Sequence, residues 1–215
     1  MENKKRAWIC AAIVAAIVVV DQIVKIMVKT HMHITEDIPV IGDWFHLHFI
    51  ENEGFAFGMT LGGDIGKIGL TLFRFAAIVA VGWYIVRLLK RQGRPSLIYC
   101  LTVILAGAVG NLIDCCFYGR IFSASYYDVA MLFPPEGGYA PLLQGKVVDM
   151  FYFPFFEFDW PQWVPAIGGK HFIFFSAIFN IADAAITIGA FWLLVELIIS
   201  EKNKKKALAE EKSEE

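Results

Sequence analysis

Residues 97–117 read LIYCLTVILAGAVGNLIDCCF, an apolar run whose only amide and carboxylate side chains, Asn111 and Asp114, lie near its end. A helix needs about 20 apolar residues to cross the hydrocarbon core of a bilayer, and this run is long enough. Three more runs qualify, at about residues 8–28, 68–89 and 172–199. The sequence therefore predicts four transmembrane helices.

The composition also indicates a membrane protein. Of 215 residues, 57% are hydrophobic and 19% are charged, and the mean hydropathy is +0.56, which is too apolar for an ordinary soluble domain. The net charge is only −2, and nothing in this charge balance suggests a nucleic-acid partner, so we expect none. The first apolar run is longer than the core of a secretory signal peptide, so we interpret it as a retained helix.

The Lys and Arg residues predict how the helices are oriented, because short cytoplasmic loops carry an excess of both. They cluster at residues 4–6, 87–94 and 202–206. The connections 29–67 and 118–171 are poor in them for their length. We therefore expect both termini in the cytoplasm and both long connections outside. Residues 1–200 would form a single membrane domain, and residues 201–215 a charged cytoplasmic tail that is either a frayed helix or disordered.

Polar side chains interrupt the predicted helices at one depth, toward the outer leaflet. They are Asp21, Lys25, Asn111, Asp114, Asn180 and Asp183. Such groups are costly inside a bilayer, so each suggests a functional site. The two Asn-x-x-Asp pairs and the Asp21–Lys25 pair have spacings of three and four residues, which place the members of each pair on one helix face.

A further acid, Asp149, lies in the second long connection, just before an aromatic run at residues 151–156. Aromatic rings favour the membrane–water interface, so we expect this run to hold Asp149 within reach of Asp183. Two carboxylates that meet where water is scarce share a proton, and one then acts as general base and the other as general acid. This arrangement supports hydrolysis of an amide by water.

Structural roles stay open for several of these groups. Asp21 has Lys25 as a ready ion-pair partner, and Asp114 is placed to cap a helix or join a polar network. The His-x-His pairs at 31–33 and 46–48 suit one face of a strand, but no third ligand is evident, so we expect no metal site.

The long connections should carry structure of their own. Residues 44–50 read WFHLHFI, which predicts a strand, and a turn signal follows at residues 52–54. We expect a small extracytoplasmic β-sheet that lies on the membrane surface as a cradle. The Pro- and Gly-containing stretch 118–143 predicts a loop or a surface helix.

Five blocks, in this order, resemble the lipoprotein signal peptidase (signal peptidase II) family. They are VDQIVK (20–25), ENEGFAFG (51–58), GNLID (110–114), GKVVDMF (145–151) and FNIADAAI (179–186). The resemblance extends over about residues 20–190. It implies a multi-pass aspartic endopeptidase of the bacterial cytoplasmic (inner) membrane. Such an enzyme removes the signal peptide from diacylglyceryl-modified prolipoproteins by cutting before the lipidated cysteine.

By this resemblance, Asp149 and Asp183 are the catalytic pair. The positions that match substrate-binding or supporting residues are Asp21, Lys25, Asn52, Gly54, Asn111, Asp114 and Asn180. The resemblance also implies no cofactor, an active site toward the outer (periplasmic) leaflet, contact with membrane lipid, and inhibition by globomycin-type cyclic peptides.

The sequence departs from the family pattern in two places. The family usually has Arg directly after the acid of the GNLID block, where this chain has Cys115, and Arg120 is a candidate replacement. The stretch between Asp114 and Asp149 is also longer than the family's usual short link.

Two other classes of function fit an apolar chain with buried acids. A proton-coupled transporter would have broken helices at matching places in two halves. A non-catalytic scaffold would tolerate loss of the Asp183 carboxylate.

Overall fold

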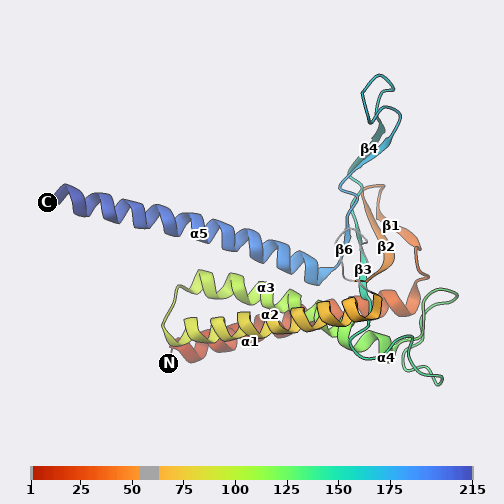
Figure 1. The fold of residues 1–215 in the computed structure, drawn as a ribbon, viewed down its shortest axis with the longest axis horizontal. Helices are drawn as coiled ribbons and strands as arrows, with labels where there is room; N and C mark the ends of the chain where they lie inside the picture. The colour runs from red at the N-terminus through yellow and green to blue at the C-terminus, as the bar shows by residue number, and fades with distance from the viewer. Residues whose placement is uncertain (1, 54–62, 215) are drawn as a thin grey trace. The chain divides into compact units, whose positions relative to one another are not determined.

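Four long helices dominate the computed structural model, which describes residues 2–53 and 63–214 (Figure 1). They are α1 (Glu2–His31), α2 (Gly63–Lys90), α3 (Pro95–Ile113) and α5 (Ile181–Glu214). Each contains a stretch that is long and apolar enough to cross a membrane. A helix satisfies its backbone hydrogen bonds internally, as the hydrocarbon core requires. The predicted four apolar helices are confirmed.

The last helix differs from its predicted bounds at both ends. It begins at Ile181 rather than at about residue 172, because Phe172 and Phe174 lie in a strand, where aromatic side chains are favoured. It continues to Glu214, so the charged tail is helical, which is one of the two states expected of it.

The third helix does not end at Ile113 but changes its winding. A π-helical turn, η2 (Asp114–Tyr118), is followed by the short α4 (Gly119–Ile121). Turns of this kind are frequent at functional sites. Beyond α4, the chain to residue 146 is mostly loop, with one bridge between Phe122 and Leu132.

The chain packs as two compact units. The first comprises Met1–Val20, Leu72–Asn111 and Ile181–Glu215, and the second comprises Asp21–Thr71 and Leu112–Asn180. In the first unit, the backbones of α3 and α5 approach each other closely at Gly107. A Cβ at this position would overlap the Ala182 carbonyl oxygen. Small residues allow such contacts between membrane helices. The expected single domain stays a prediction.

The second unit contains an antiparallel sheet in the order β1-β2-β3-β6 (Figure 1). Its strands are β1 (Asp37–Ile41), β2 (Phe45–Asn52), β3 (Val147–Tyr152) and β6 (Ile178–Phe179). Phe49, Val148 and Met150 are fully buried and form a core with Tyr118 and Phe122. The predicted small sheet is therefore present, and β3 is held between two neighbours.

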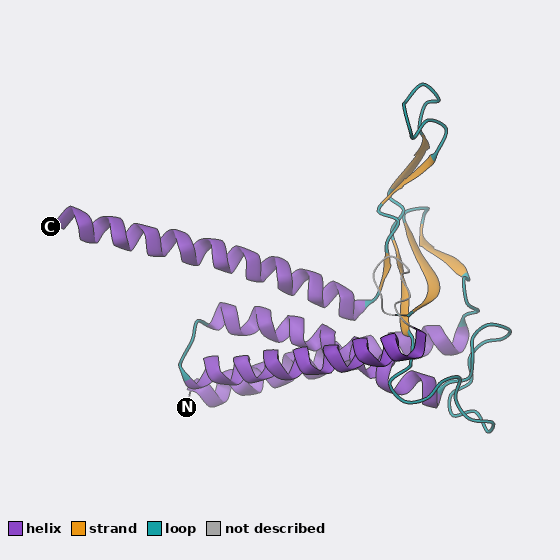
Figure 2. Ribbon diagram, viewed as in Figure 1, coloured by secondary structure: helices purple, strands orange, loops and turns teal. Residues whose placement is uncertain are grey.

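A separate two-stranded ribbon lies between β3 and β6 in the chain (Figure 2). It consists of β4 (Phe156–Asp159) and β5 (His171–Phe174). No pattern in the sequence predicted this ribbon, and residues of β5 fall within the range predicted for the last helix.

Candidate functional site

Asp149, in the second unit, is a buried acid whose two carboxylate oxygens both accept hydrogen bonds from side-chain amides. It lies opposite Ile50 in the β2–β3 pairing, and only 1% of the residue is exposed. Asn52 Nδ2 donates to its Oδ2 at 3.2 Å, and Asn180 Nδ2 donates to its Oδ1 at 2.6 Å. Two amides from different strands and loops therefore fix both carboxylate oxygens, as buried polar groups require.

Asn180 also ties the strand to the chain that leads into α5. Its Nδ2 donates to the Val148 carbonyl oxygen at 3.2 Å, and the residue is fully buried. Of the residues expected to bind substrate or support the site, Asn52 and Asn180 therefore contact Asp149. The neighbouring Gly54 lies outside the described residues.

Asp183 belongs to the first unit, in the first turn of α5. Asn111 Nδ2 of α3 donates to its Oδ1 at 2.8 Å. Both side chains, with Arg74, line a cavity of about 310 Å³ whose other walls are apolar residues of α2, α3 and α5. A carboxylate near a helix N-terminus is also favoured by the helix dipole. The structure thus pairs the two Asn-x-x-Asp motifs through Asn111 and Asp183.

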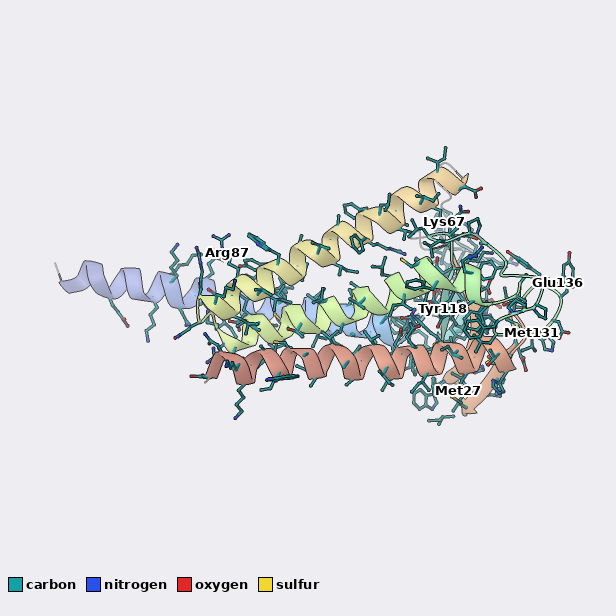
Figure 3. All side chains as sticks on the ribbon, turned by 90° about the horizontal axis from the view of Figure 1, so that it is seen from below. Met27, Lys67, Arg87, Tyr118, Met131 and Glu136 are labelled. Carbon is teal, nitrogen blue, oxygen red and sulfur yellow. The ribbon has the colours of Figure 1, made fainter. Side chains whose placement is uncertain are left out.

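A buried ion network occupies the interior of the second unit. Lys25 Nζ lies 2.9 Å from Asp21 Oδ2 and 2.8 Å from Asp114 Oδ2, and all three side chains are fully buried. Gln22 Nε2 donates to Asp114 Oδ1 at 2.9 Å, and the Tyr118 hydroxyl, labelled in Figure 3, donates to Gln22 Oε1 at 3.1 Å. Asp21 and Lys25 form the ion pair that their spacing suggested.

Asp114 connects this network to the strand of Asp149. Its Oδ2 accepts a hydrogen bond from the backbone N–H of Val148 at 3.3 Å. The chain before β3 also packs tightly on η2 at Gly145. A Cβ at this position would overlap the Asp114 carbonyl oxygen, and the Gly145 N–H donates to Cys115 O at 2.8 Å. Asp114 therefore helps to position β3, the strand that carries Asp149.

Sequence reasoning overlooked Gln22 and a cluster at Lys29. Gln22 is a polar group inside an apolar span, and that signal was available. Lys29 Nζ forms an ion pair with Glu51 and donates to Ser125 Oγ at 2.9 Å. The rings of Phe49, Phe122 and Tyr139 surround it, at 5.1–5.9 Å from Nζ. This contact, which depends on the fold, ties the long 118–146 stretch to α1 and β2.

A more exposed group of charges precedes β3. Lys146 Nζ lies 3.1 Å from Glu53 Oε1, and Lys67, labelled in Figure 3, pairs with Glu53 as well. Burial favours the protonated form of Glu53, but hydrogen bonds from Lys67 and Lys146 keep its pKa below the ordinary value. Burial opposes the charge on Lys146, yet hydrogen bonds to Tyr126 and Glu53 raise its pKa.

Other predicted candidates take no part in these groups. Arg120 is exposed, and no ion pair joins it to the side chains that the structure describes, so its role as a replacement for the arginine of the family pattern stays a prediction. His46 Nδ1 lies 2.8 Å from Asp37 Oδ1, and His48 Nδ1 lies 3.5 Å from its Oδ2. Within the described ranges, no three His, Cys, Asp or Glu side chains are grouped to hold a metal.

Four apolar helices with buried carboxylates, amides and a lysine define a multi-pass membrane protein. The fold agrees with this class. A bacterial membrane enzyme solved by the in meso method at 2.3 Å resolution matches with a TM-score of 0.58 over 91% of this chain and 90% of that chain. A second, at 1.9 Å resolution, matches with a TM-score of 0.55. At 22% identity, both likenesses concern the fold alone.

A family model described as "Signal peptidase (SPase) II" matches residues 13–199, and the chain therefore belongs to the signal peptidase II family. It is 47% identical over 191 residues to a lipoprotein signal peptidase of Porphyromonas gingivalis, which covers 87% of this chain and 81% of that protein. It is 33% identical over 201 residues to one of Amoebophilus asiaticus, with coverages of 92% and 79%.

Proposed function

We propose that this protein is a membrane-embedded aspartic endopeptidase that removes the signal peptide from diacylglyceryl-modified prolipoproteins. It would cut the peptide bond before the lipidated cysteine. Family membership supports a lipoprotein signal peptidase. The observation that carries the aspartic mechanism is Asp149, a buried carboxylate held at both oxygens by the amides of Asn52 and Asn180.

The second catalytic carboxylate in this proposal is Asp183. Covalent connection supports the pairing, because Asp183 follows Asn180 by three positions, and a chain of three residues spans at most about 11 Å. Asn111 holds one oxygen of Asp183 as the other two amides hold Asp149. Both carboxylates are thus oriented before substrate binds, which reduces the reorganisation needed during the reaction.

The reaction proceeds through an activated water. The two aspartates share one proton, and the ionised carboxylate accepts a proton from the water as its oxygen attacks the scissile carbonyl carbon. The protonated carboxyl donates to the carbonyl oxygen, giving a tetrahedral intermediate. When the C–N bond breaks, the carboxyl that received the proton of the water donates a proton to the leaving nitrogen, and a hydroxyl of the intermediate returns its proton to the other carboxylate, so the pair again holds one proton. The products are a free signal-peptide carboxyl group and the amine of the lipidated cysteine.

The proposed setting is the bacterial inner membrane, with both termini in the cytoplasm and the site toward the outer leaflet. The β1-β2-β3-β6 sheet would then lie at the outer surface as a cradle for substrate arriving from the lipid. The Lys and Arg distribution supports this orientation. Globomycin-type cyclic peptides would compete with the substrate for the same site.

Cleavage of a purified diacylglyceryl-modified prolipoprotein in detergent tests this proposal. Wild type should release the signal peptide, whereas Asp149→Asn and Asp183→Asn should each lower the rate by about 10⁴-fold, the effect of losing a member of a catalytic unit. Asp128→Asn, an exposed acid of the 118–146 stretch, should cleave normally.

Thermal unfolding of each variant separates lost chemistry from lost structure. Near-normal cleavage by either Asn variant would refute the aspartate pair. No cleavage by folded wild type would refute the peptidase assignment and leave the family relationship as ancestry.

A further inference from the structure

The β4–β5 ribbon has two chemically different faces. The pairing sets Phe156 opposite Phe174 and Phe158 opposite Phe172. Their ring centroids are 4.7 Å and 5.1 Å apart, and Trp160 extends the row at 5.0 Å from Phe158. Since side chains alternate along a strand, these five rings lie on one face.

The opposite face is charged. It carries Glu157, Asp159 and His171, together with Ile173. His171 Nδ1 lies 2.8 Å from Asp159 Oδ1, and its Nε2 lies 3.3 Å from Glu157 Oε2. These hydrogen bonds raise the pKa of His171, which favours a charged imidazolium on a face already bearing two carboxylates. This face is built to remain in water.

The aromatic face stays exposed within the described part of the chain. The four phenylalanines are 36–53% exposed, and Trp163 in the connecting loop is 82% exposed. A two-stranded hairpin is marginally stable alone in water, and a continuous exposed apolar face marks an interaction surface. The ribbon therefore needs a surface that covers its rings.

We propose that the aromatic face of the β4–β5 ribbon docks onto the lipid headgroup and acyl-chain boundary of the same membrane that the four helices cross. Two observations favour lipid as the occupant. Phe and Trp rings with charges on the opposite side are the pattern of elements that lie in a membrane interface. The ribbon is also tied to a span, because only residues 175–180 separate β5 from α5.

Contact of the ribbon with lipid is a property separate from peptide cleavage, and it can be measured without a cleavage assay. A polarity-sensitive fluorescent amino acid would replace either Phe158 or Glu157 by amber suppression. These neighbours point to opposite faces and are both exposed, so each replacement leaves the packed units untouched. The full chain is then placed in vesicles of phosphatidylethanolamine and phosphatidylglycerol. Brominated acyl chains act as the quencher in lipid, and iodide acts as the quencher in water.

The probe at position 158 should be quenched by the brominated lipid and shielded from iodide, and the probe at 157 should behave in the opposite way. Equal iodide quenching at both positions would overturn the proposal, since the ribbon would then stand in water. Strong lipid quenching at both would overturn it too, because the whole ribbon would be immersed. Shielding of position 158 only after a prolipoprotein is added would show a substrate surface instead.

Discussion

Lys25 is the residue on which the interior of the second unit depends. It is a fully buried cation that lies within 3 Å of carboxylate oxygens from both Asp21 and Asp114. Burying three charged groups costs desolvation free energy. The ion pairs and the hydrogen bonds from Gln22 offset this cost only while they all stay intact. Through the Asp114 bond to Val148 N–H, the same network holds the strand that carries Asp149.

Replacing Lys25 with Met should therefore destabilise the protein strongly. The change keeps the length of the side chain but leaves two buried carboxylates without their cation, which costs about 3–5 kcal/mol. Thermal unfolding in detergent micelles would measure the loss. Lys170→Met is the matched control, because Lys170 is exposed and its loss should change stability by less than about 0.5 kcal/mol. Equal stability of the two variants would show that the network contributes little.

At the scale of the elements, the close packing of α3 against α5 places Asn111 within hydrogen-bonding distance of Asp183. The helices approach closely because Gly107 and Gly189 have no Cβ; one at Gly189 would lie 2.7 Å from Ile104 Cγ1. Gly107 and Asn111 are four residues apart on α3, so the close contact and the hydrogen bond to Asp183 share a helix face. The geometry at Asp183 thus follows from helix packing.

Gly107→Ala should separate the two helices and lower both stability and cleavage. The added methyl group meets the backbone oxygen of Ala182, which cannot rotate away, and overpacking of this kind costs about 1–3 kcal/mol. Gly82→Ala on α2 is the control, because a Cβ there meets nothing within 4 Å and alanine favours helix. Unfolding temperatures and cleavage rates of both variants check this. A harmless Gly107→Ala would mean that the helices readily shift.

For the molecule as a whole, sequence patterns predicted the features that depend on local composition. Apolar length predicted four helices, and the aromatic-rich run at residues 44–50 predicted β2. The ribbon was missed because its Phe-rich strand also reads as the start of a membrane span. The cage around Lys29 and the tie between Asp114 and Val148 join residues distant in the chain, which no local pattern encodes.

The orientation of the whole chain remains a prediction that can be tested with cysteines. Four crossings place both termini on one side, and the exposed Lys202, Lys204, Lys205 and Lys206 assign that side to the cytoplasm. A membrane-impermeant maleimide should therefore label Asp43→Cys, in the exposed turn between β1 and β2, on intact spheroplasts. Glu201→Cys should react only after the membrane is opened, and the parent chain reports the background of the native cysteines. Labelling of Glu201→Cys on intact spheroplasts would invert the orientation and move the proposed site to the inner leaflet, where translocated prolipoproteins could not reach it.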